Sequence, residues 1–98
     1  MTASLSTHVL DTGAGRPAAG VKVELRRGEE LVAAGETDAD GRIASLHDRL
    51  ELGRYRLVFH PPSAFFRRVE LEIELGDDAH HHVPLVVSPY SCASYRGS

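Results

Sequence analysis

Histidine is the residue type in this chain best suited to chemistry, because its side chain titrates near neutral pH and can act as a general base or acid. The chain has 98 residues, and six of them are histidine: His8, His47, His60, His80, His81 and His82. For any single one of these positions, a solvated histidine on a strand is the commonest alternative. Spacing and neighbours must therefore distinguish a site from an ordinary surface.

Alternation along the strands groups these histidines by face. Ser6 and His8 are expected on one face of an early strand. His80 and His82 share a face of a later strand, while His81 points the other way. A His-x-His pair can bind zinc if His8 or a carboxylate supplies a third ligand. No Cys-x-x-Cys or His-Glu-x-x-His motif accompanies the pair, so the sequence predicts no metal site.

Two further features could contribute to a site. Arg42 follows an Asp-Gly turn and opens a strand, and its planar guanidinium could bind a flat ring that carries carbonyl groups and negative charge. An arginine there is normally solvent-facing, and spacing alone does not decide. The last strand stops at Gly97 and Ser98. The terminal carboxylate and the Ser98 hydroxyl are therefore candidate site groups, with a frayed end as the alternative.

Composition limits the partners. The net charge of −3 argues against nucleic acid or an anionic membrane as a partner. No apolar run approaches the roughly 18 residues of a membrane span, and the first residues lack the basic and apolar regions of a secretion signal. Cys92 is the one cysteine, which suits a reducing compartment, and we expect it to be packed rather than nucleophilic. We expect a cytoplasmic protein.

The elements that must position these residues are short strands separated by turns. Period-2 alternation and turn residues predict a helix-poor pattern, with strands at residues 5–11, 21–26, 31–37, 54–59, 69–75, 80–87 and 90–96 and one more opening at Arg42. Ser63 is expected to cap one short helix over residues 64–68. Seven or eight strands at this spacing indicate an antiparallel sandwich or barrel, in a single domain over residues 1–98.

Three segments, taken together, resemble the 5-hydroxyisourate hydrolases of the transthyretin-like family. They are residues 5–11 followed by 15–18, residues 37–42, and residues 80–91 ending in the Tyr-Arg-Gly-Ser of residues 95–98. That terminal motif separates these hydrolases from transthyretin, the thyroid-hormone carrier of the same fold. The resemblance covers nearly the whole chain. One departure is that Phe66 runs almost directly into Val69, where the family usually has a longer stretch.

The resemblance implies an all-β, transthyretin-like two-sheet antiparallel β-sandwich of seven to eight short strands with one short helix. It also implies a homotetramer, a dimer of dimers, with active sites in a channel between dimers. The family needs no metal or organic cofactor. Its reaction opens the six-membered ring of 5-hydroxyisourate at an amide bond, giving 2-oxo-4-hydroxy-4-carboxy-5-ureidoimidazoline in urate degradation.

Residue by residue, the resemblance assigns His8 and His82 as the catalytic histidines and Arg42 as the substrate-binding arginine. Tyr95 matches a substrate contact, and Ser98 matches the terminal serine of the site. One histidine would deprotonate water for attack on the ring carbonyl, and Arg42 would orient the substrate and stabilise the oxyanion. Ser98 would hold the water or a histidine. The sequence leaves open which histidine is the base.

Two other functions stay open at this point. The first is a transthyretin-like carrier whose channel holds a small aromatic ligand without converting it, although such a channel does not require the polar set of His8, Arg42, His82 and Ser98. The second is a metal-binding sandwich that uses His80 and His82.

Overall fold

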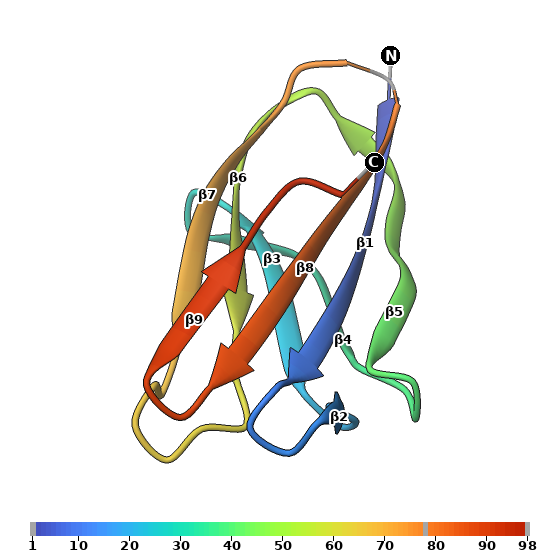
Figure 1. Ribbon diagram of the computed structural model, residues 1–98. Helices are drawn as coiled ribbons and strands as arrows, with labels where there is room; N and C mark the ends of the chain where they lie inside the picture. The colour runs from blue at the N-terminus through green and yellow to red at the C-terminus, as the bar shows by residue number, and fades with distance from the viewer. Residues whose placement is uncertain (1, 78, 98) are drawn as a thin grey trace.

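The computed structural model describes residues 2–77 and 79–97, and these residues form nine strands in two sheets (Figure 1). The first sheet contains β1 (Thr2–Asp11), β2 (Arg16–Pro17), β5 (Arg42–Glu51), β8 (His80–Ser88) and β9 (Ser91–Ser94). The second sheet has the order β4 (Glu30–Glu36), β3 (Lys22–Arg27), β6 (Gly53–Phe59) and β7 (Val69–Leu75). The predicted all-β, two-sheet architecture is therefore confirmed.

Strand β1 lies inside the first sheet, between β5 with β2 on one side and β8 on the other. The pairing of β1 with β8 is parallel, so the expectation of a wholly antiparallel sandwich is wrong at this place. Parallel neighbours cannot be joined by a tight turn. Here the second sheet lies between the two strands in the sequence, which provides the necessary long connection.

The core lies between the sheets and follows the period-2 alternation. In β1 the side chains of Leu5 and Val9 are fully buried, and in β8 Leu85 takes the matching inward position. The second sheet contributes Leu25 and Phe59, which are also fully buried. Each buried side chain of this size stabilises the fold by about 1.5–3 kcal/mol. The alternate residues of β1 and β8 are thereby directed to the outer face of the first sheet.

The predicted short helix after Ser63 is absent from the described chain. Ser63 Oγ accepts hydrogen bonds from the N–H groups of Phe65 and Phe66, at 3.2 and 2.9 Å, as a cap would. However, Phe59 at the end of β6 pairs directly with Val69 at the start of β7. The segment between them only has to close a hairpin, and a single helical turn is unfavourable because nucleation fixes several residues for one hydrogen bond.

The strand count exceeds the predicted seven to eight because of β2. No strand was predicted between residues 11 and 21, but Arg16 and Pro17 fold back to pair with Asp11 and Leu10 of β1. Along residues 2–77 and 79–97, no helix has the length and apolar character needed to cross a membrane.

Candidate active site

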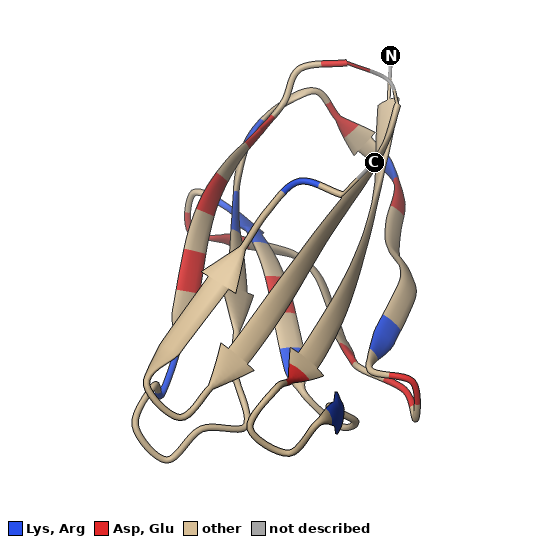
Figure 2. Ribbon diagram, in the orientation of Figure 1, with Lys and Arg blue, Asp and Glu red and all other residues tan. Residues whose placement is uncertain are grey.

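The outer face of the first sheet gathers histidine and serine side chains from two strands. The parallel register sets Ser4 beside His80 and Ser6 beside His82. Figure 2 shows that β1, β8 and β9 carry almost no Lys, Arg, Asp or Glu, in contrast to the acidic β7. The imidazoles therefore lie on a surface of low formal charge, where one nearby cation or anion has a large effect on the local electrostatic potential.

A tight turn at residues 38–41 positions the neighbouring arginine. Asp38 Oδ1 accepts hydrogen bonds from the N–H groups of Asp40 and Arg42, at 2.9 and 3.0 Å. Gly41 has a φ of +74°, and a Cβ added there would lie 2.5 Å from the carbonyl oxygen of Val9. Only glycine fits such a close approach at a positive φ. The turn is thus packed directly on the backbone of β1.

This packing also fixes His8. Its Nε2 lies 2.9 Å from the carbonyl oxygen of Asp40. Because a carbonyl can only accept, Nε2 must carry the proton of this hydrogen bond. In the neutral ring, the nitrogen of His8 that remains as an acceptor is therefore Nδ1.

Arg42 is brought next to His8 by the antiparallel pairing of β5 with β1, in which the two residues are direct partners. The residue is exposed. No carboxylate in the described part of the chain forms an ion pair with it. Its guanidinium can therefore bind an external group without first giving up a partner among those residues.

His82 completes the group. Its Nδ1 lies 2.7 Å from Ser6 Oγ, and its backbone carbonyl accepts a hydrogen bond of 2.7 Å from the N–H of Gly97. Partial burial lowers the pKa of His82 below the ordinary 6.5, and electrostatic repulsion from His8, Arg42 and His80 lowers it further. The ring is therefore neutral near pH 7 and able to accept a proton.

The structure thus brings His8, Arg42 and His82 to one sheet face from three different strands. It places Tyr95 elsewhere: this side chain is 58% exposed and lines a cleft of about 330 Å³ with β7 residues and the buried His81. No hydrogen bond in the described part of the chain joins Tyr95 to the three site residues. The predicted role of Ser98 falls outside the described residues.

Two other candidates from the sequence can also be placed. The His-x-His pair has no third metal ligand nearby, since residues 2–77 and 79–97 contain no cluster of three or more His, Cys, Asp and Glu that could hold an ion. Cys92 packs against the core, and burial raises the pKa of its thiol. A protonated thiol is a poor nucleophile, which supports a packing role.

Sequence reasoning overlooked three parts of this site: the Ser6 hydroxyl, the contact of His80 with it, and the approach of Gly97 to His82. Ser6 and His8 were expected on one face of their strand, as were His80 and His82, so the residues on each strand face were predicted. The pairing of β1 with β8 was not predicted, because it joins residues 76 positions apart in the sequence.

Fold and site together define a small β-sandwich protein that carries a histidine–arginine site on the outer face of one sheet. The chain belongs to the HIUase/Transthyretin family, whose profile matches residues 5–97. It is 41% identical to 5-hydroxyisourate hydrolase 2 of Rhizobium meliloti, covering 96% of this chain and 95% of that protein. It is 44% identical to 5-hydroxyisourate hydrolase of Deinococcus radiodurans, with the same coverage of 96% and 95%.

The solved structure of Klebsiella pneumoniae 5-hydroxyisourate hydrolase superposes with a TM-score of 0.88 at 38% identity, covering 98% of this chain and 99% of that one. The alignment with the Rhizobium meliloti relative spans 114 positions, more than the 98 residues of this chain. That relative therefore has residues without a counterpart here.

Proposed function

We propose that this protein hydrolyses 5-hydroxyisourate to 2-oxo-4-hydroxy-4-carboxy-5-ureidoimidazoline. One observation carries the proposal: His8, Arg42 and His82 converge from β1, β5 and β8 on one face, with a neutral imidazole beside a guanidinium. The names of full-length relatives support the same activity. A neutral base next to a fixed cation is what hydrolysis of a planar cyclic amide requires, because water must lose a proton while the carbonyl oxygen gains charge.

We assign the base to His82 rather than His8. Its lowered pKa keeps His82 unprotonated at neutral pH, whereas His8 already donates its Nε2–H to Asp40. With Nδ1 of His82 engaged by Ser6, the nitrogen left to take a proton from water is Nε2. The hydroxide equivalent then attacks the ring carbonyl.

Arg42 stabilises the negative charge that develops on the carbonyl oxygen, and its two-pronged guanidinium orients the flat ring. His8 offers Nδ1 as an acceptor for a ring N–H. When the carbon–nitrogen bond of the ring breaks, the leaving nitrogen takes the remaining proton of the added water and becomes part of the ureido group. The other end of the opened ring is left as a carboxylate, so the proton that His82 took from the water is the one released in each turnover.

We further propose that the protein acts as a homotetramer, a dimer of dimers, in which a second copy covers the site. Four clefts formed by the described residues have none of His8, Arg42 and His82 in their linings. An open sheet face excludes little water, whereas a channel between copies would exclude more and strengthen the electrostatic effects. A monomeric mass by light scattering at micromolar concentration would contradict this.

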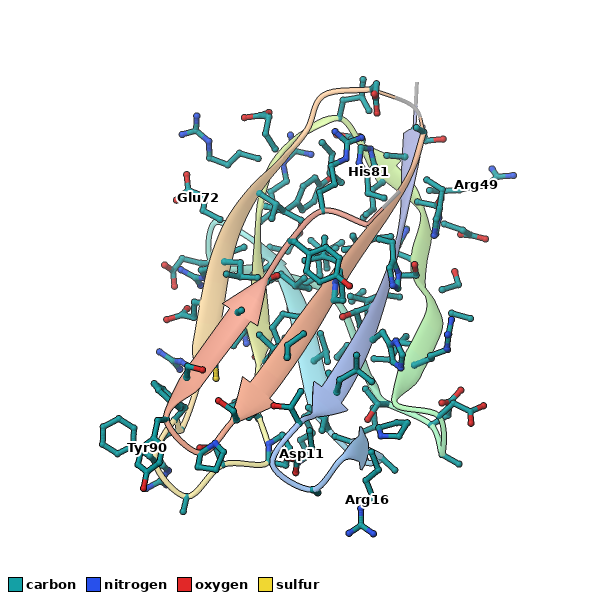
Figure 3. All side chains as sticks on the ribbon, in the orientation of Figure 1. Asp11, Arg16, Arg49, Glu72, His81 and Tyr90 are labelled. Atoms are coloured by element: carbon teal, nitrogen blue, oxygen red, sulfur yellow. The ribbon has the colours of Figure 1, made fainter. Side chains whose placement is uncertain are left out.

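Ser98 and Tyr95 belong to the same proposal. Gly97 is hydrogen-bonded to His82, which supports a role for the adjoining Ser98 in holding water or a histidine. Within one chain Tyr95 lines a separate cleft, so Tyr95→Phe tests whether this side chain contacts the substrate in the proposed tetramer, in which case KM should rise. Tyr90→Phe is the matched control, because Tyr90 is 94% exposed and projects away from the turn between β8 and β9 (Figure 3).

The activity is tested by generating 5-hydroxyisourate in the cuvette from urate with urate oxidase and following its ultraviolet absorbance. Added protein should accelerate the decay, and His82→Gln should abolish most of the acceleration. His60→Gln is the matched control, because His60 lies near Glu24 on the second sheet, outside the site. Decay at the spontaneous rate with folded wild-type protein would favour a small-ligand carrier instead. We place the reaction in the cytoplasm, supported by the presence of a single cysteine.

A further inference from the structure

Four polar side chains form a continuous hydrogen-bonded row along the outer face of β1 and β8. Ser6 Oγ lies 2.7 Å from His82 Nδ1 and 2.8 Å from His80 Nε2, and Ser4 Oγ lies 2.6 Å from His80 Nδ1. We propose that Ser6 and His80 are positioning residues that form a proton relay between His82 and solvent. This inference rests on the proposed hydrolase function for its purpose, but not for its geometry.

The row runs from the protein to water. Ser6 is buried, with 6% of its surface exposed, His82 and Ser4 are half-buried, and His80 is exposed. Ser6 is held in place because the parallel pairing sets it directly beside His82 on the neighbouring strand. A buried hydroxyl with two imidazole partners and little access to water has few alternative arrangements. The row therefore has a fixed inner part and an outer end in solvent.

Counting protons on Ser6 shows why the two histidines are coupled. A hydroxyl has one proton to donate, so Ser6 can donate to only one of its two imidazole neighbours, and the other must donate to Ser6. If Ser6 donates to His80, then His82 carries its proton on Nδ1 and has a free lone pair on Nε2. If Ser6 donates to His82, then His82 carries its proton on Nε2. The tautomer of His82 is therefore linked to that of His80.

The relay step follows from these two states. His82 Nε2 takes a proton from the attacking water, and the Nδ1 proton passes to Ser6 Oγ. The former proton of Ser6 moves to His80 Nε2, the Nδ1 proton of His80 moves to Ser4, and the proton of Ser4 enters solvent. One proton has left the site, and each side chain is again neutral. This matches a reaction that releases one proton per turnover.

The surrounding charges favour such a relay over storage of a proton. Besides His80, the groups that act on His82 are His8 of β1 and Arg42 of β5, and both disfavour a second positive charge. Passing the proton outward as it arrives avoids a long-lived imidazolium beside Arg42. The relay step leaves His82 neutral with its proton on Nε2. Proton exchange with solvent then restores the tautomer with the proton on Nδ1 before the next turnover.

The inference is tested with Ser6→Ala, Ser6→Thr and His80→Ala, and with Ser88→Ala as a matched control. Ser88 is also on β8, but its hydroxyl bonds to Ser91 at 2.7 Å, away from the row. The first measurement is the ¹⁵N chemical shift of both His82 ring nitrogens in the free protein, which reports the tautomer. His80→Ala should move these shifts through Ser6, and Ser6→Ala should move them more. Ser6→Thr retains a hydroxyl and should stay near wild type.

The second measurement is kcat across pH with the 5-hydroxyisourate decay assay. Ser6→Ala and His80→Ala should lower kcat roughly 10- to 100-fold, within the range of about 10²–10⁴ that general acid–base catalysis contributes. They should also lower the solvent deuterium isotope effect, while KM stays near wild type. A residue with only a structural role would leave the tautomer and the isotope effect unchanged.

Unchanged His82 shifts in both Ser6→Ala and His80→Ala would overturn the relay. The exposed position of His80 makes folding of that variant secure, so one informative variant remains if Ser6→Ala does not fold. Since the shifts are measured without substrate, they test the relay even if the wild-type protein has no activity. In that event the proposed function fails while the hydrogen-bonded coupling is still measured.

Discussion

Gly97 offers the sharpest test of the site, because a single methyl group added there would meet the imidazole of His82, the proposed base. An added Cβ would lie 2.8 Å from His82 Cδ2, 3.2 Å from the His82 carbonyl oxygen and 3.3 Å from its Cβ. Carbon atoms in contact prefer about 3.5–4.0 Å, so the Gly97→Ala overlap requires a movement of roughly 1 Å. Either the ring or the terminal segment must move.

Both movements should damage catalysis. A shift of the ring misplaces the proposed base, and a shift of the terminal segment breaks the 2.7 Å hydrogen bond from Gly97 N–H to the His82 carbonyl. A misplacement of about 1 Å can cost about 100-fold in rate, and we expect kcat of Gly97→Ala to fall by roughly that factor. Global stability should fall by only about 1–3 kcal/mol, the usual range for overpacking.

The assay is 5-hydroxyisourate decay at saturating substrate, with thermal unfolding measured on the same samples. Gly76→Ala is the matched control, because an added Cβ there has no atom within 4 Å among those described. It should retain wild-type kcat. Wild-type kcat in folded Gly97→Ala would refute the reasoning that the terminal segment packs on a catalytic His82.

Four further predictions follow from the same geometry. Gly41→Ala should destabilise the fold by several kcal/mol in denaturant unfolding, because its Cβ would lie 2.5 Å from a backbone oxygen at a φ of +74°; a loss below about 0.5 kcal/mol would contradict this. The acid limb of kcat/KM should lie below the ordinary histidine value of 6.5, because burial and then neighbouring positive charge lower the pKa of His82, and an acid limb above 6.5 would exclude His82 as the base. Arg42→Met should raise the His82 pKa in an NMR titration, because it removes one of those charges, and should lower kcat about 10²- to 10³-fold, as loss of an oxyanion donor does. The lowered pKa of His82 also implies that the free energy of unfolding declines as pH falls below about 6.5, because the unfolded chain binds a proton at His82 more strongly than the folded chain does. If the free energy of unfolding of the wild type declines no more steeply over this pH range than that of His82→Gln, the prediction is contradicted.

Much of the fold could be predicted because alternation is a local property. Residues two positions apart share a face in the strands Val69–Leu75 and His80–Ser88, so both strands could be recognised from the sequence. The Asp-Gly turn before Arg42 could likewise be recognised, because glycine is required where φ is positive. The failed helix shows the limit of such local signals. Ser63 makes its capping bonds. However, the pairing of Phe59 with Val69 leaves only a short connecting segment, which is too short to offset the unfavourable nucleation of a helix.

The sequence by itself determined every strand except β2, the inward and outward faces of those strands, and, through its motifs, which side chains are candidates for chemistry. It could not determine which strands are neighbours, because pairing depends on contacts between distant residues and not on local propensity. Only the tertiary structure decided that β1 and β8 run parallel with Ser6 beside His82, and that the turn at Gly41 packs on β1 close enough for Asp40 to hold His8. Those two long-range contacts convert scattered histidines into a candidate site in which His8 has a defined tautomer and His82 is a neutral imidazole.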